Sequence, residues 1–144
     1  MTVAQCLYRA DIEADPDGGF IVTFPDVPEA LTFGKTRDEA LASAREALGL
    51  ALRGILADGG TLPEARAGKG VPVSPDAHDT IKLAVIAAFH QAAITKTELA
   101  RRLGRTETEA RRILDPDHGT KLPLLQQALE AMGKRLVISV AEAA

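Results

Sequence analysis

The spacing of apolar residues changes near His78, and this change limits the folds open to the chain. Over residues 6–12, apolar and polar side chains alternate, which is the period of a half-buried strand. From residue 81 to residue 89, the apolar side chains instead recur at helical spacing. Strands in one half and helices in the other are typical of the α+β class. We therefore predict an α+β fold with a module over 1–73, a linker over 74–80 and a second module over 81–144.

The first module reads as three strands, a helix and an edge strand. Turn residues at 15–19 join the first strand to a second at 20–24, and a short third strand follows at 31–33. Residues 36–39 match a capping box that opens a long helix, and residues 71–73 form an edge strand in which proline is tolerated. The expected buried stripe of the helix is Leu41, Ala44, Leu48, Leu52 and Ile55.

The second module reads as four helices and a terminal strand. The first helix is expected from Asp79, and capping boxes at 95–98 and 106–109 open two helices of about eight residues. Gly104 ends the first of these short helices. A fourth helix is predicted over 122–132, and the β-branched run 136–140 predicts a strand.

The two short helices have the spacing of a DNA-reading helix pair. A glycine between them permits a sharp turn, and the segment 95–104 resembles the helix-turn-helix of the phage-repressor family. In that family the position after the glycine is often apolar, whereas here it is Arg105. The alternative is a solvated helical surface whose arginines pair with Glu98, Glu107 and Glu109. The predicted DNA-binding residues are Lys96, Thr97, Arg105, Thr106, Glu107, Thr108, Arg111, Arg112 and Lys121.

A single module of this size makes few DNA contacts, so we expect a dimer on two half-sites about 34 Å apart. The terminal strand offers a means of dimerisation, because an isolated edge strand needs a partner. It pairs with the same strand of a second chain or packs on its own domain. The expected dimerisation residues are Leu136, Val137, Ile138 and Val140.

Charge is divided unevenly along the chain. Up to His78 there are seven basic and twelve acidic residues, a net charge of −5, and after it ten basic and eight acidic residues give +2. The division suggests two partners of opposite charge, although surface charges can also fall this way by chance. The single Cys6 fits a reducing compartment, and we found no secretory signal and no apolar run near the length of a membrane span. These features predict a cytoplasmic protein.

No residue pattern predicts catalysis strongly. The carboxylates near the first hairpin could serve a metal-dependent nuclease only if they converged in a cleft, and the strand alternation places Asp11 and Glu13 on a polar face. The three histidines are scattered, so we expect no zinc site, no metal and no cofactor. Aromatic residues are 3% of the chain, which disfavours stacking on single-stranded RNA.

Several segments together resemble the HicB antitoxin family. They are residues 8–12, the Asp-Gly-Gly-Phe at 17–20, the Phe-Pro-Asp-Val-Pro at 24–28, the helix start at 36–41 and the helical second half. The chain departs from the family pattern at Glu29 and Ala30, where small residues such as Gly-Cys are usual.

The resemblance implies a partial RNase H-like first domain that binds HicA, a small basic toxin that cleaves mRNA. It also implies that the second domain represses the operon, with no enzymatic activity, as a homodimer or homotetramer. A ligand-responsive transcription regulator without a toxin is the alternative. The residues expected to bind the toxin are Asp11, Glu13, Asp15, Asp17, Phe24 and Asp26.

Overall fold

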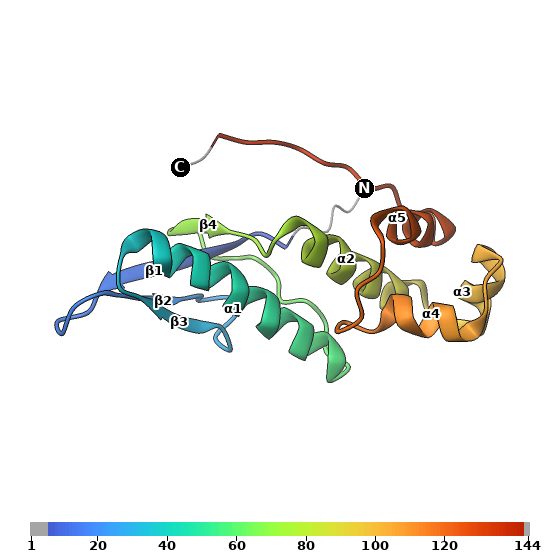
Figure 1. Ribbon diagram of the computed structural model, residues 1–144, viewed down its shortest axis with the longest axis horizontal. Helices are drawn as coiled ribbons and strands as arrows, with labels where there is room; N and C mark the ends of the chain where they lie inside the picture. The colour runs from blue at the N-terminus through green and yellow to red at the C-terminus, as the bar shows by residue number, and fades with distance from the viewer. Residues whose placement is uncertain (1–5, 143–144) are drawn as a thin grey trace. The chain divides into compact units, whose positions relative to one another are not determined.

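The computed structural model describes residues 6–142, so the first five and last two residues of the predicted modules lie outside it. The described chain forms one four-stranded sheet and five helices, which confirms the predicted α+β class. It divides into two compact units, Met1–Thr80 and Ile81–Ala144 (Figure 1). Within residues 6–142, no helix is both long and apolar enough to span a bilayer.

The first unit has the predicted order of three strands, a helix and a strand. The sheet is antiparallel in the order β3-β2-β1-β4, and α1 lies across one of its faces (Figure 1). Pro72 lies in the edge strand β4 opposite Arg9, where its missing N–H leaves the rest of the sheet intact. The elements are β1 (Tyr8–Ala14), β2 (Phe20–Thr23), β3 (Leu31–Gly34), α1 (Arg37–Ala57) and β4 (Val71–Val73).

The turn between β1 and β2 forms from the residues that the sequence indicated. Gly18 and Gly19 have φ of 103° and 80°, a region that favours glycine. The Asp15 N–H donates to the carbonyl of Gly19 at 2.9 Å, and the Asp15 carboxylate accepts from the Asp17 N–H at 3.0 Å. The Asp15 side chain therefore helps to close the turn locally.

The buried line of α1 lies one position away from the predicted stripe at both ends. Leu41 and Ile55 are only half-buried, and at the start of α1 the backbone of Ala40 lies close to Gly34 of β3. A Cβ on Gly34 would lie 2.2 Å from the Ala40 backbone nitrogen, so the small Ala40 faces the sheet there. The fully buried line of apolar side chains is Ala40, Ala44, Leu48, Leu52 and Leu56.

The second unit is helical, and its first helix starts earlier than predicted. The Asp76 carboxylate accepts from the Asp79 N–H at 3.0 Å and caps α2, which therefore begins at Ala77 rather than Asp79. The segment 74–80, expected to be a linker, thus contains the first turn of α2. The helices are α2 (Ala77–Ala92), α3 (Lys96–Leu103), α4 (Glu107–Leu114) and α5 (Leu122–Ala131).

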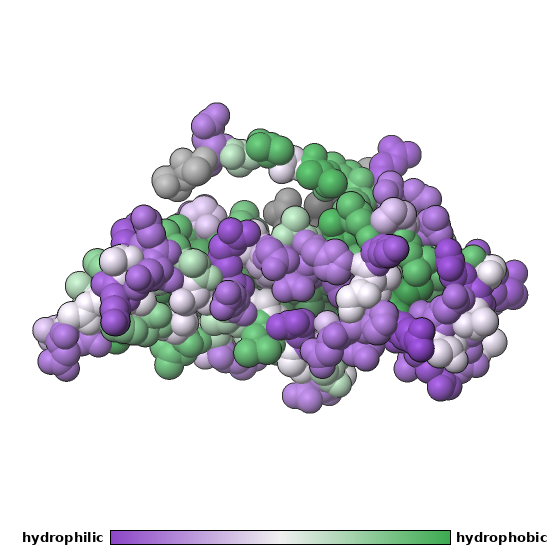
Figure 2. Space-filling model, in the orientation of Figure 1, coloured by the Kyte–Doolittle hydropathy of each residue, from purple (hydrophilic) through white to green (hydrophobic). Residues whose placement is uncertain are grey.

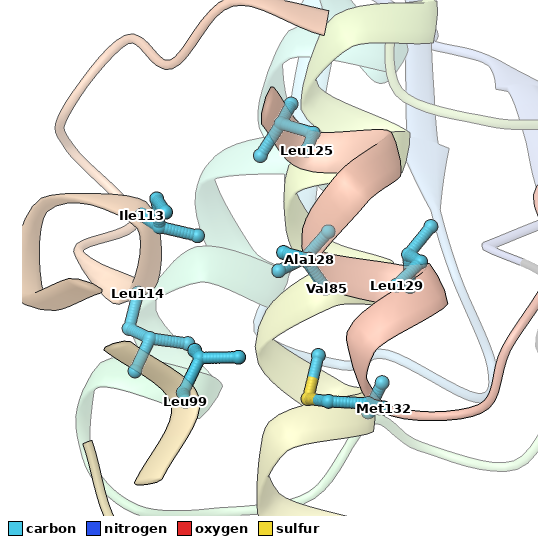
Figure 3. Close-up of a cluster of buried hydrophobic side chains, with 9 residues drawn as sticks. Val85, Leu99, Ile113, Leu114, Leu125, Ala128, Leu129 and Met132 are labelled. Carbon is cyan, nitrogen blue, oxygen red and sulfur yellow. The ribbon is translucent and has the colours of Figure 1, made fainter. Parts of the chain in front are cut away.

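Side chains from all four of these helices meet in one apolar cluster (Figure 3). Leu99 of α3 and Ile113 of α4 are almost fully buried in it, so the two short helices share one core. Leu136 packs against the edge of the cluster. The buried members are Val85, Ala88, Leu99, Ile113, Leu114, Leu125, Ala128, Leu129 and Met132.

Replacing Gly34 by alanine tests the close approach of α1 to β3. We expect Gly34→Ala to lower the free energy of unfolding by about 1–3 kcal/mol, because the new methyl group meets rigid backbone. The matched control is Gly54→Ala, at an exposed position of α1 where a Cβ meets nothing within 4 Å. Because alanine favours a helix more than glycine does, this change should raise the free energy of unfolding by about 0.5–1 kcal/mol. Urea unfolding measures both, and two changes of the same sign would contradict this packing.

Candidate functional site

α3 and α4 are joined by a turn of three residues. Gly104 lies in the left-handed region with φ 65° and ψ 35°, and the Arg105 N–H then donates to the Ala100 carbonyl at 2.9 Å. The apolar sides of both helices are buried, which leaves their polar sides on the surface. A helix pair of this length and turn can place its second helix in a major groove.

Of the three predicted capping boxes, one is complete. The Thr106 hydroxyl accepts from the Glu109 N–H at 3.2 Å, and the Glu109 carboxylate accepts from the Thr106 N–H at 2.9 Å. Thr95 caps α3 in the same way, but the expected return bond from Glu98 is not formed, because that carboxylate pairs with arginines. At α1, Thr36 caps the helix and its glutamate instead accepts from the N–H of residue 35. The complete box fixes the start of α4.

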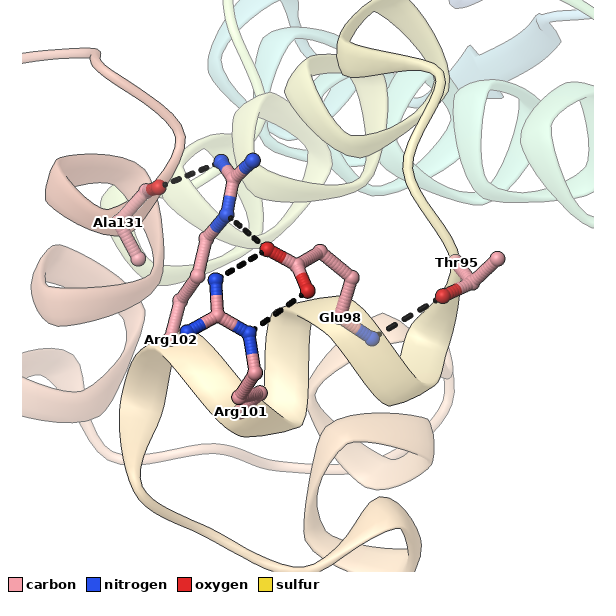
Figure 4. A network of polar contacts seen from close by, with 5 residues as sticks. All are labelled: Thr95, Glu98, Arg101, Arg102 and Ala131. Carbon is pink, nitrogen blue, oxygen red and sulfur yellow. Dashed lines mark hydrogen bonds and ion pairs between the residues drawn. The ribbon is translucent and has the colours of Figure 1, made fainter.

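Glu98 is the centre of a surface network on α3 (Figure 4). Its carboxylate accepts from Arg101 at 2.6 and 2.8 Å and from Arg102 Nε at 3.0 Å. Arg102 also donates to the Ala131 carbonyl at 3.0 Å, which ties α3 to the end of α5. These hydrogen bonds lower the pKa of Glu98 to about 2, so the network is intact at neutral pH.

All nine residues predicted to bind DNA are exposed, and several already have partners in the unit. Arg111 pairs with Glu107 at 2.7 Å, and Arg105 lies 3.7 Å from Glu109. The Thr97 hydroxyl lies 3.3 Å from the Glu107 carboxylate. The ion pairs expected of a solvated helical surface are therefore present. Each is exposed, so each is weak and can be exchanged for a contact to a ligand.

A buried lysine that the sequence reasoning missed holds the far end of α4. Lys82 of α2 is 2% exposed, and its Nζ donates to the Arg112 carbonyl at 2.9 Å and to the Thr120 hydroxyl at 2.8 Å. Burial lowers its pKa to about 8, and the nearby Asp115 partly offsets this effect. The helical spacing carried the signal, because Lys82 precedes the buried Val85 by three residues.

A cleft of about 380 Å³ lies between α4, the segment after it and the start of α5. Its cationic lining comes from Arg105, Arg112 and Lys121, all of which were predicted to bind DNA, and Glu109 adds one carboxylate. Lys121 precedes α5 and gives that helix no side-chain cap. The structure thus brings together three predicted basic residues that come from the turn before α4, the last turn of α4 and the residue before α5.

The residues predicted to bind a toxin do not form one surface. Asp11 and Glu13 lie on the face of the sheet that α1 leaves open, while Asp15 and Asp17 lie in the adjoining turn. Phe24 is 1% exposed and belongs to the core, so the prediction that it contacts a partner is wrong. The strand alternation already pointed to this, since Phe24 lies two residues after the inward-facing Val22 of β2.

The Asp26 carboxylate holds a loop of the first unit in place. One of its carboxylate oxygens accepts from the backbone N–H of Arg66 at 2.9 Å and of Ala67 at 2.8 Å. The loop is also held by Tyr8, whose hydroxyl donates to the Pro63 carbonyl at 2.7 Å. One oxygen of Asp26 therefore holds loop 61–69 in place, and these two bonds do not use the other oxygen.

The predicted strand 136–140 is not formed in the single chain. Residues 134–142 are extended without belonging to any helix or sheet, and hydrophobic surface is visible along the C-terminal stretch (Figure 2). The alternative that this segment packs on its own domain holds only for Leu136, because Val137, Ile138 and Val140 are 77%, 70% and 97% exposed. Pairing with a second chain stays a prediction.

Among residues 6–142, no three His, Cys, Asp or Glu side chains gather closely enough to hold a metal ion. Cys6 is buried, which raises the pKa of its thiol to about 11 and keeps it in the unreactive neutral form.

Comparison with known proteins gives consistent matches. The family described as "HicB_like antitoxin of bacterial toxin-antitoxin system" matches residues 8–101. The chain is 35% identical over 138 residues to Antitoxin HicB of Escherichia coli (strain K12), which covers 90% of this chain and 95% of that protein. It is 36% identical over 138 residues to Antitoxin HicB 1 of Photorhabdus laumondii, covering 92% of this chain and 86% of the other.

The depressed pKa of Glu98 predicts a dependence of stability on acid. Its unfolded pKa is near 4.5, so its stabilising effect is complete above that value and is lost as pH falls towards about 2. We expect Glu98→Gln to lower the melting temperature at pH 7 and to flatten the loss of stability below pH 4.5. Thermal unfolding from pH 2 to 7 measures this, with exposed Glu130→Gln as the control. An equal acid response in Glu98→Gln and the original chain would contradict the network.

Proposed function

Because the chain belongs to the family of HicB-like antitoxins of bacterial toxin–antitoxin systems, we propose that it neutralises a HicA-type mRNA-cleaving toxin and represses its own operon. It does so by binding alone, with no chemistry of its own. The observation that carries the proposal is the match over nine-tenths of the chain to proteins named as antitoxins. The two units divide the work, with the first for the toxin and the second for DNA.

The exposed side of α4 supports the DNA-binding half of the proposal. Arg111 can contact a guanine edge with two hydrogen bonds, and Thr108 lies on the same exposed helix. The cationic cleft beside α4, with Arg112 and Lys121, suits DNA phosphates. Lys82 holds the end of α4 through the Arg112 carbonyl. A phosphate bound in the cleft would therefore lie at a defined place relative to α4.

A single unit of this size binds DNA weakly, so we propose that the operator is bound as a dimer or higher oligomer. The exposed apolar stretch 137–140 supports this, because two such segments can pair as strands, and Ile138 and Val140 would then lie on one shared face. A symmetric pairing would also match two half-sites one helical turn apart.

Replacing Arg111 by alanine separates base reading from phosphate contact. We expect Arg111→Ala to weaken binding to DNA from upstream of the chain's own gene by about 1–3 kcal/mol, and unrelated DNA much less. Fluorescence anisotropy at several salt concentrations measures both. The control is Arg37→Ala, an exposed arginine in the first unit. Equal loss on both DNAs would make Arg111 a phosphate contact, and wild-type binding to neither would overturn operator binding.

Neutralising the open-face carboxylates tests the toxin-binding half. We expect the partner to be a small basic protein encoded beside this chain, and co-expression of that protein with the full chain should restore growth. In binding kinetics at low salt, Asp11→Asn with Glu13→Gln should slow association about tenfold, because these charges steer a basic partner. The control removes two α1-layer charges, Glu46→Gln with Asp58→Asn.

Three outcomes would contradict the toxin-binding half. No rescue and no complex would remove the toxin partner. Operator affinity that changes with a small metabolite would favour a ligand-responsive regulator. Metal-dependent cleavage of nucleic acid that is lost with Asp11 and Glu13 would make the first unit a nuclease.

A further inference from the structure

Strand register brings exposed apolar side chains and carboxylates together on one face of the first unit. Directly opposed residues of antiparallel strands point to the same side of a sheet. One row across β1, β2 and β3 is Glu13, Ile21 and Phe33, and the next row is Asp11, Thr23 and Leu31. The opposite face, which α1 covers, includes the fully buried Ala10 and Val22.

The three apolar side chains in these rows are exposed to water, although large apolar side chains are usually buried. Leu31 is 65% exposed, Phe33 48% and Ile21 36%. An antiparallel sheet with one face in water normally alternates apolar residues inside with polar residues outside. β2 and β3 break that rule at three neighbouring positions, and a contiguous exposed apolar patch of this kind marks a binding surface.

The hairpin turn between β1 and β2 supports the aromatic side chain of this patch. A Cβ on Gly19 would lie 2.4 Å from the tip of the Phe33 ring, so the ring rests directly over that glycine. Phe33 is thus supported by backbone on one side and faces water on the other. An aromatic side chain that is already ordered loses little conformational entropy when a partner covers it.

Charge at the rim selects the kind of partner. Asp11 and Glu13 border the apolar patch on β1, while Arg9, on the same face, reaches away to the Gly70 carbonyl at 3.0 Å. Two copies of this face would bring Asp11 and Glu13 close to their own equivalents, and like charges across an interface disfavour that pairing. A partner with an apolar centre and a basic rim fits better.

We infer that Ile21, Leu31 and Phe33 are the apolar centre of the surface that binds the basic toxin, with Asp11 and Glu13 as its acidic rim. This inference rests on the proposed function and adds which face and which side chains the toxin covers. Most of the affinity then comes from the three apolar side chains, and the two carboxylates act mainly on association.

The test compares two leucines of equal exposure on opposite layers of the same unit. Leu31 in β3 is 65% exposed, and Leu50 in α1 is 64% exposed. With the full chain and the co-encoded basic protein in calorimetric titration, Leu31→Glu should weaken the complex about tenfold or more. Leu50→Glu should change it less than twofold. Neither change should alter operator binding, and Leu31→Ala, a milder change, should lie between wild type and Leu31→Glu.

The outcomes separate this inference from the function on which it rests. If the wild-type chain forms no complex, the proposed function fails. If wild type binds and Leu50→Glu is the damaging change, the toxin lies on the helix layer and the inference is overturned. If Leu31→Glu changes only the oligomeric state, measured by light scattering, the face joins copies of this chain and the inference is again overturned.

Discussion

One helix can cover only one face of a four-stranded sheet, and this constraint decides what the first unit can do. α1 seals one face with a line of buried alanines and leucines, beginning where Ala40 meets Gly34. No other described element of this unit forms a second helical layer, so the opposite face stays in contact with water. Because Leu31 and Phe33 lie on that face, the unit keeps part of its apolar surface outside its own core. The fold itself thus supplies a surface that a partner can cover.

In the second unit, the main constraint is the stability of α4, a helix of only eight residues. Isolated helices of that length are marginal in water, so α4 depends on its two ends and its buried side. The capping box of Thr106 and Glu109 fixes its start. Lys82 fixes its end through the Arg112 carbonyl, using a charge whose burial opposes ionisation. Both ends are therefore fixed by polar contacts, while its outward side is left for a ligand.

Local rules predicted the order of elements, and their failures have identifiable causes. Alternation and turn residues were sufficient for the first unit, because each signal lies within a few residues of its partner. Periodicity did not distinguish Ala40 from Leu41, since the choice depends on where Gly34 lets the helix approach the sheet. Lys82 was missed and Phe24 was assigned to a toxin-binding surface, although the spacing of both from buried neighbours pointed inward. The segment 136–140 has strand composition, but a strand requires a partner strand.

The ion pairs on α3 and α4 also bear on the proposed operator binding, which would require more than one copy of the second unit. In the proposed complex, Arg111 exchanges its pair with Glu107 for a contact to DNA, which leaves a carboxylate near the phosphates. Glu109 beside Arg105 adds a second such carboxylate. These repulsions reduce non-specific affinity, because that affinity comes almost entirely from phosphate contacts. A site that offers Glu107 a cytosine amino group recovers part of the loss. In the proposed dimer, two units joined through 136–140 would sum this selectivity over both half-sites.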